Sequence, residues 1–188
     1  MGPPQTTARA LYAQTVDHLP IPAVPDLRVG LGALVLVHGP PSAGKSTLTL
    51  KWLASIEGPV CLLSSEERLG PTLGARLQRL AIRRDDLHIL GQVPVDHLAK
   101  VLVQNRCRSL LVDSVSATTM GATELRQLIA QTHLGAVFGT VQVAKDNTMR
   151  GPNTLAHEAD VIVEVMDGQW TVVKSRYQPI GLSGAVHF

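Results

Sequence analysis

Two glycines, a lysine and a serine stand at a spacing that could bind the phosphates of a nucleotide. They lie in "GPPSAGKS", residues 39–46, which follows the pattern GxxxxGK[ST]. Glycine lets backbone N–H groups approach phosphate oxygens, the lysine reaches the β- and γ-phosphates, and the serine hydroxyl holds Mg²⁺. We therefore predict a loop for ATP and Mg²⁺, with the lysine also acting in catalysis. The nucleotide-binding residues assigned to it are Gly39, Pro40, Ser42, Ala43, Gly44, Lys45, Ser46 and Thr47.

The flanking sequence places this loop between a strand and a helix, where the mechanism requires it. "ALVLVH" (33–38) is a short apolar run typical of a buried strand, and "KSTLTLKWLASI" (45–56) has apolar residues at helical spacing. The helix N-terminus adds partial positive charge beside bound phosphate. The alternative is a glycine-rich turn that binds nothing, and the strand-loop-helix context argues against it.

A phosphate loop of this kind needs a second carboxylate that positions Mg²⁺ together with Ser46. Asp113 closes the apolar run "SLLVD" (109–113), which predicts a buried strand with the acid at its carboxyl end. We assign Asp113 as the second magnesium residue. The alternative is an aspartate that ends a strand and has no ligand.

Hydrolysis needs a group that orients or deprotonates water. Glu66 and Glu67 follow the apolar stretch "PVCLLSS" (59–65), a strand expected beside that of the phosphate loop. Both are catalytic candidates, and we prefer Glu66. The alternative is a solvated acidic pair in the first turn of a helix, where such residues are common.

Apolar runs alternate with helical periodicity along the rest of the chain. Strands are expected at 59–65, 87–90, 108–116 and 135–144, and helices at 7–16, 70–82, 95–105 and 123–133. Residues 161–177 predict a hairpin that turns at Asp167–Gly168. Fully apolar strands separated by helices are typical of a parallel sheet covered on both faces. We predict an α/β fold with a mostly parallel twisted sheet and an antiparallel hairpin at one edge.

Length and composition fit one globular domain. The chain has 188 residues, 45% hydrophobic and 17% charged, with a net charge of +2 that neither indicates nor excludes nucleic-acid binding. Its proline-rich residues 1–30 are expected to be an extension or linker before an ATPase domain at 31–188. Two cysteines without metal or disulfide spacing, and no run long enough to span a bilayer, favour a cytoplasmic protein without membrane contact.

Several further stretches resemble the RecA-type ATPase core, and most closely the central ATPase domain of the bacterial RadA (Sms) family. The stretches are "GPPSAGKSTLTL", "LLSSEE" followed by "ARLQRLAI", "SLLVDSVSA", "VQVAKDNTMRGPNTLAHEADVIVEVMDG" and "VVKSRYQPIG". They occur in family order between residues 33 and 182, and the stretch 141–168 is the most specific. The resemblance implies a RecA-like P-loop fold and an ATPase that assembles as a homo-oligomer, a hexameric ring or a filament, and works on DNA.

The resemblance also implies roles for residues late in the chain. Lys174 and Arg176 match a lysine-x-arginine element that reaches into the neighbouring subunit's active site, where an arginine stabilises charge on the γ-phosphoryl group. The alternative is two cations on an exposed hairpin strand. Gln142 matches a polar sensor between γ-phosphate and DNA; a structural amide is the alternative. His157 matches a family histidine. Half of a metal site with Glu158 and Asp160 is the alternative to the helix-capping or hydrogen-bonding role that we expect, and we predict no metal other than Mg²⁺.

The resemblance places DNA contact in the loop 145–153, with Lys145 and Arg150 as the DNA-binding residues and single-stranded DNA as the expected partner. An ordinary surface loop is the alternative. The chain departs from the family in having Ser175 and Tyr177 where an asparagine and a phenylalanine are usual. It also lacks the four-cysteine zinc module and the C-terminal protease-like domain, so we expect a minimal RecA-like core.

Three functions fit these residues to different degrees. The first is a DNA-stimulated, oligomer-dependent ATPase connected with recombination, repair or replication, which the cationic loop favours. The second is a regulatory scaffold in which ATP controls assembly and docking to an unidentified protein partner, which the altered "KSRYQ" element favours. The third is a small-molecule phosphotransferase, which needs an arginine-rich lid and a substrate pocket that the sequence does not indicate.

Overall fold

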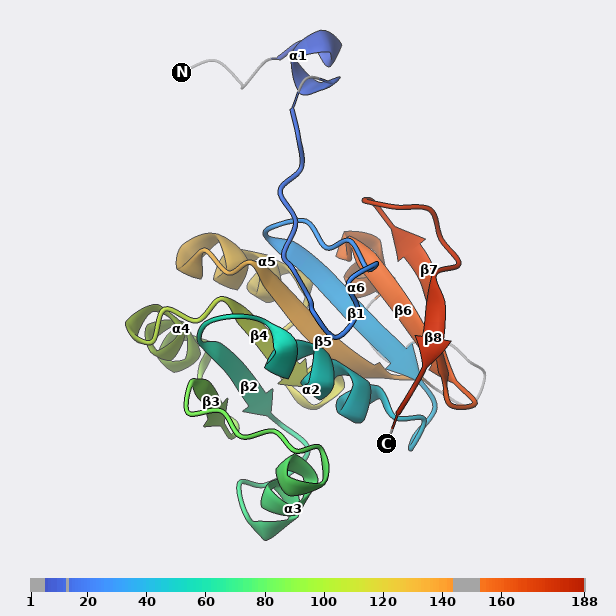
Figure 1. The fold of residues 1–188 in the computed structure, drawn as a ribbon. Helices are drawn as coiled ribbons and strands as arrows, with labels where there is room; N and C mark the ends of the chain where they lie inside the picture. The colour runs from blue at the N-terminus through green and yellow to red at the C-terminus, as the bar shows by residue number, and fades with distance from the viewer. Residues whose placement is uncertain (1–5, 13, 144–152, 188) are drawn as a thin grey trace.

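One mixed sheet organises the chain in the computed structural model, which describes residues 6–12, 14–143 and 153–187. Within these residues eight strands follow the order β3-β2-β4-β5-β1-β6-β7-β8 (Figure 1). The strands from β3 to β6 in this order pair in parallel, whereas β7 and β8 are antiparallel. The predicted fold class is therefore confirmed. Strand bounds are β1 Ala33–Gly39, β2 Val60–Ser64, β3 Leu87–Leu90, β4 Ser109–Asp113, β5 Ala136–Gln142, β6 Val161–Met166, β7 Gln169–Ser175 and β8 Ser183–Ala185.

Helices cover both faces of the sheet, because the central parallel strands are apolar on both sides. Side chains of α2 and α3 join the core on one face, and those of α4, α5 and α6 join the core on the other. Figure 1 shows the sheet between these helices. No helix in the described part of the chain is long and apolar enough to cross a membrane. Helix bounds are α1 Ala8–Tyr12, α2 Lys45–Ser55, α3 Pro71–Arg79, α4 Val95–Gln104, the 3₁₀ helix η1 Val115–Ala117, α5 Ala122–Thr132 and α6 Asn153–Glu158.

The differences from the predicted elements have local causes. The strand expected at 108–116 ends at Asp113, since the chain turns there into η1. The short strand β8 is missing from the sequence prediction, because "SGA" contains no β-branched residue that indicates a strand. The hairpin turn at Asp167–Gly168 is as predicted, with positive φ angles of 50° and 75° at these two residues.

Residues 19–29 are part of the core, although they belong to the stretch expected as an extension or linker. Five apolar side chains there are at most 7% exposed: Leu19, Ile21, Val24, Leu27 and Val29. They pack in the core on the α2 face, and the Leu19 N–H donates to the Val29 carbonyl at 2.8 Å. The division at residue 30 remains a prediction, and the packed part of this structure begins well before it.

Both cysteines are buried as free thiols. Burial raises the pKa of Cys61 to about 12 and that of Cys107 to about 11. Since the thiolate is the reactive form, neither side chain is suited to redox chemistry at neutral pH.

The packing of residues 19–29 predicts that Leu27→Ala destabilises the protein. The substitution removes a side chain that is 3% exposed and leaves a cavity, so the free energy of unfolding should fall by about 2–5 kcal/mol. Val16→Ala is the matched control, because Val16 is 55% exposed and should change stability by less than about 0.5 kcal/mol. Urea unfolding followed by circular dichroism measures both. Equal midpoints for the two variants would contradict this account.

Candidate active site

The phosphate loop joins the end of β1 to the start of α2 and depends on its two glycines. A Cβ atom on Gly39 would lie 2.1 Å from the backbone oxygen of Val165 in the neighbouring strand β6. Gly44 has a φ of 99°, the left-handed conformation that glycine adopts without strain, and α2 begins at the next residue. The backbone at Gly39 therefore lies too close to β6 for a side chain, and the turn at Gly44 has a conformation that other residues adopt only with strain.

A pocket of about 510 Å³ opens at the carboxyl edge of the sheet, in the size range of small-ligand sites. The predicted residues that line it are Ser42, Gly44, Lys45, Ser46, Thr47, Glu66, Asp113 and Gln142. Gly39, Pro40 and Ala43 belong to the same loop but are not among the lining residues, and the Ala43 N–H donates to the Pro40 carbonyl at 3.3 Å. Residues from β4, β5, α2 and the turn after β2 thus converge on one cavity, although their numbers span a hundred positions.

Lys45 lies at the base of the phosphate loop. Its Nζ donates to the carbonyl oxygens of Gly39 at 2.9 Å and Pro40 at 2.8 Å. Burial lowers the pKa of Lys45, while the charges of Glu66 and Asp113 act in the opposite direction. The ammonium is thus held by neutral acceptors, which a phosphate oxygen could replace.

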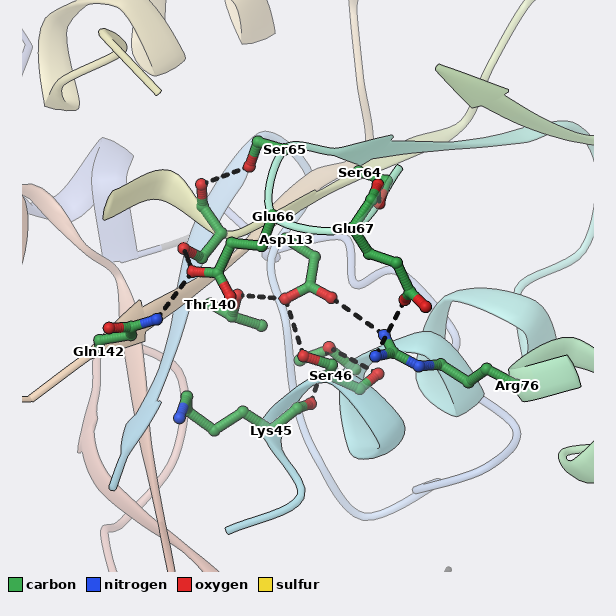
Figure 2. A network of polar contacts seen from close by, with 12 residues as sticks. Lys45, Ser46, Ser64, Ser65, Glu66, Glu67, Arg76, Asp113, Thr140 and Gln142 are labelled. Carbon is green, nitrogen blue, oxygen red and sulfur yellow. Dashed lines mark hydrogen bonds and ion pairs between the residues drawn. The ribbon is translucent and has the colours of Figure 1, made fainter. Parts of the chain in front are cut away.

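Asp113 joins three elements at the pocket wall (Figure 2). Its Oδ1 accepts hydrogen bonds from the Ser46 hydroxyl at 2.8 Å and the Thr140 hydroxyl at 2.7 Å. Carboxylate and hydroxyl oxygens are the ligands that Mg²⁺ prefers, directly or through water, so this pair fits the predicted magnesium site. The sequence prediction missed Thr140. Its position two residues after the buried Phe138, inside an apolar strand, was the available indication.

Glu66 is held at the pocket by two groups, one just after the end of β4 and one at the end of β5. Its Oε1 accepts from the Ser114 hydroxyl and from the Gln142 amide, the latter at 2.9 Å. The backbone of the same turn is fixed to β4, since the Ser65 N–H donates to the Asp113 carbonyl at 2.8 Å. Glu66 is exposed and lines the pocket, so water can reach its carboxylate.

Glu67 points to a different partner. Its Oε2 forms an ion pair with Nη2 of Arg76 at 3.0 Å, and Glu67 does not contribute to the lining of the pocket (Figure 2). The arrangement therefore favours Glu66 over Glu67 as the group next to reacting water. Arg76 lines the pocket and was not among the predicted site residues. The indication in the sequence was a basic helix directly after the two acids.

Lys174 and Arg176 lie at and just beyond the end of β7, two strands away from β1 and its phosphate loop. Lys174 pairs with Ile162 near the start of β6, and β6 is parallel to β1. Ile162 in turn pairs with Leu36 in the middle of β1, and neither cation is among the residues that line the pocket. Lys174 Nζ donates to the carbonyls of Ala156 and His157, both at 2.9 Å, and Nε of Arg176 lies 3.5 Å from Asp160 Oδ1.

The residues that depart from the family pattern connect the Lys174–Arg176 segment to residues 18–28 near the N-terminus. Ser175 Oγ accepts hydrogen bonds from the N–H groups of Tyr177 at 3.1 Å and Gln178 at 3.2 Å, two and three residues later. The Tyr177 ring meets His18 edge to face at 5.9 Å, and Gln178 accepts a hydrogen bond from the Arg28 N–H. Tyr177 and Gln178 thus contact residues 18–28, and Ser175 holds the turn that carries them.

Two predicted DNA-binding residues, Lys145 and Arg150, lie outside the described residues, so their assignment remains a prediction. His157 is exposed, and its carbonyl is the group that accepts from Lys174. Among the described residues, no three histidine, cysteine, aspartate or glutamate side chains form a group that could hold a metal ion.

The close approach at Gly39 predicts that Gly39→Ala destabilises the fold. The added methyl group meets the Val165 carbonyl and an unfavourable φ of 155°, so stability should fall by about 1–3 kcal/mol or more. Gly74→Ala is the matched control, since nothing lies near its Cβ position inside α3, and it should stabilise by about 0.5–1 kcal/mol. Thermal unfolding compares the two. A Gly39→Ala midpoint at or above that of the unchanged protein would contradict the steric argument.

Comparison with known proteins gives related sequences for most of the chain. No protein-family model matches. The chain is 28% identical over 149 residues to the DNA repair protein RadA of Bacillus subtilis, covering 70% of this chain and 32% of that protein. It is 26% identical to the RadA of Escherichia coli, covering 73% of this chain and 33% of that protein. It is 30% identical to the RadA of Treponema pallidum, covering 69% of this chain and 31% of that protein. The chain therefore spans about a third of the length of these relatives.

A solved structure gives the fold. The ATPase domain of G40P aligns with a TM-score of 0.63 at 14% identity, covering 80% of each chain. At this identity the similarity establishes the fold alone. The chain has the RecA-like ATPase-domain fold, and its sequence is similar to that of the RadA proteins over 69–73% of its length in these three alignments.

Proposed function

We propose that the chain binds ATP with Mg²⁺ in the pocket at the carboxyl edge of the sheet and hydrolyses it. The observation that carries this proposal is the meeting of Ser46, Asp113 and Glu66 beside the phosphate loop. These residues come from three separate segments, and each has the chemistry that one part of phosphoryl transfer to water needs. The similarity to RadA proteins supports the same reading.

The phosphates would be held by the loop backbone and by Lys45, which exchanges its contacts with the Gly39 and Pro40 carbonyls for phosphate oxygens. Ser46 and Asp113 would hold Mg²⁺, which when bound neutralises charge on the phosphate oxygens. Thr140 fixes the Asp113 carboxylate in the orientation that this requires, because it donates to the same oxygen as Ser46.

Glu66 orients the attacking water and accepts its proton. Gln142 donates to Glu66 and so keeps the carboxylate turned toward the pocket. The Gln142 backbone N–H also donates to Ser116 Oγ at 3.3 Å, which joins the end of β5 to η1. A displacement of Gln142 would therefore move the Glu66 carboxylate. This coupling is how Gln142 would act as the proposed sensor.

The position of Lys174 and Arg176 supports a homo-oligomer, as a hexameric ring or a filament. Neither cation lines the pocket of its own copy, and we infer that both serve the site of another copy. Arg176 is suited to this role because its side chain is 57% exposed. An arginine supplied in trans stabilises charge on the γ-phosphoryl group and makes hydrolysis depend on assembly.

The proposed second ligand is single-stranded DNA, contacted by Lys145 and Arg150 in a process of DNA repair or recombination. The support is the similarity to proteins named for DNA repair and the place of the two cations, which follow Gln142 by a few residues. DNA bound there would act on Gln142 and, through it, on Glu66.

An ATP-gated scaffold with slow turnover and a protein partner is the second candidate. It is favoured by the contacts of Lys174 and Arg176 within their own chain and by the fastening of Tyr177 and Gln178 to residues 18–28. These contacts give the trans element a structural role that does not require rapid hydrolysis.

The ATPase proposal predicts that the chain hydrolyses ATP in the presence of Mg²⁺ and that Lys45→Ala lowers the rate at least about a hundredfold. Lys100→Ala, on α4 away from the pocket, is the control and should keep the rate. Phosphate release is measured with and without single-stranded DNA. Stimulation by DNA supports the DNA-acting ATPase, a slow rate indifferent to DNA supports the scaffold, and hydrolysis unaffected by Lys45→Ala contradicts both.

The trans assignment predicts complementation between two inactive variants. Arg176→Ala should lower turnover at least about a hundredfold while ATP still binds. Mixing it with Lys45→Ala should restore part of the rate, because an intact pocket on one copy then meets an intact Arg176 on the next. A mixture as inactive as its components, formed under conditions where the copies exchange, would refute the trans role.

A further inference from the structure

Arg76 is a cation of the pocket that the mechanism above does not use. It lies on α3, the helix that follows the two acidic residues, and its side chain is 27% exposed. Its guanidinium contacts two carboxylates. Nη2 is 3.0 Å from Glu67 Oε2 and Nη1 is 3.5 Å from Asp113 Oδ2 (Figure 2).

These contacts place Arg76 beside Asp113 in the lining of the same pocket. Asp113 offers its Oδ1 to Ser46 and Thr140, and its Oδ2 faces Arg76. Since Ser46 and Asp113 are the proposed magnesium residues, the guanidinium and the metal would share the charge of one carboxylate. Two cations at one anion repel, so Mg²⁺ weakens the contact between Arg76 and Asp113.

The contact with Glu67 behaves differently. At 3.0 Å it is the shorter of the two, and it joins Arg76 to a carboxylate outside the pocket lining. It therefore survives the arrival of metal and keeps the guanidinium at the pocket wall. A guanidinium has five N–H donors in one plane, a geometry that matches phosphate oxygens, and the two ion pairs do not use all of them.

We propose that Arg76 binds the γ-phosphate of ATP within its own subunit, exchanging its contact with Asp113 for one with phosphate while Glu67 holds it in place. Arg76 then distinguishes ATP from ADP, and Glu67 is its positioning residue. This inference rests on the proposed function and deepens it, because it gives the site a second arginine that acts in cis beside the one supplied by a neighbour.

The test is direct binding of ATPγS and of ADP to the full chain with Mg²⁺, measured by isothermal titration calorimetry. Arg76→Ala should weaken ATPγS at least about tenfold, because a charge-assisted contact is lost, and should change ADP less than about threefold. Arg83→Ala is the matched control, an exposed arginine beyond the end of α3 and outside the pocket lining, and should leave both affinities unchanged. Equal losses for both nucleotides, or no loss, would overturn the assignment.

Two further variants keep the test decisive if Arg76→Ala does not fold. Arg76→Lys keeps the charge but not the planar pair of donors, and should lose about threefold for ATPγS alone. Glu67→Gln should lose a similar factor for ATPγS alone, since the guanidinium is no longer held. If both variants retained the full preference for ATPγS over ADP, Arg76 would have no part in recognition.

The same titrations separate this inference from the proposed function. If the unchanged protein bound neither nucleotide, both the ATPase proposal and the assignment of Arg76 would be wrong. If it bound both, lost both with Lys45→Ala and kept its preference with Arg76→Ala, the ATPase proposal would stand and the assignment would fail.

Discussion

The buried carboxylate of Asp113 is the contact on which the site depends. It is 9% exposed, and a charge at this depth needs partners that satisfy both of its oxygens. Two hydroxyls and a guanidinium supply them, from α2, β5 and α3. Because each partner comes from a different element, the ends of these elements are held together by one anion. The pocket lies beside this carboxylate, so Asp113 both holds the walls of the pocket together and gives it negative charge.

A second buried acid, Asp160, connects elements near the start of β1, as Asp113 does near the end of it. Asp160 is 5% exposed, and its Oδ2 accepts from the Leu34 N–H at 2.8 Å and pairs with Arg126 at 2.9 Å. Its other oxygen meets Arg176. β1 therefore begins beside one carboxylate and ends near another. The parallel sheet fixes the distance between the two carboxylates, and Arg176, which pairs with Asp160, does not line the pocket beside Asp113.

The sequence was sufficient for the fold and for the residues that follow strands. Asp113, Glu66 and the phosphate loop each stand directly after an apolar run, and the carboxyl ends of parallel strands meet at one edge, so their convergence could be predicted. Gln142 was found only through the family resemblance. Each of these residues stands at the end of a strand, and the end of the strand determines where its side chain lies.

Arg76 and the packing of residues 19–29 follow no such rule. A helix places its side chains by its rotation and its docking angle, which periodicity does not determine, so an arginine on α3 could not be assigned to the pocket. The prolines around residues 20–25 indicate a break in regular structure. They do not show whether the irregular segment packs against the sheet, because that depends on partners such as Tyr177 far along the chain.

The place of β1 in the middle of the sheet has a consequence for folding. Its neighbours are β5 and β6, whose first paired residues lie more than a hundred positions later in the chain. During synthesis β1 therefore emerges long before either partner exists, and its backbone groups have no neighbouring strand to pair with. Pairings of such long range form slowly. The nucleotide pocket, whose lining includes Thr140 and Gln142, thus cannot be complete before β5 has been synthesised and has joined β1.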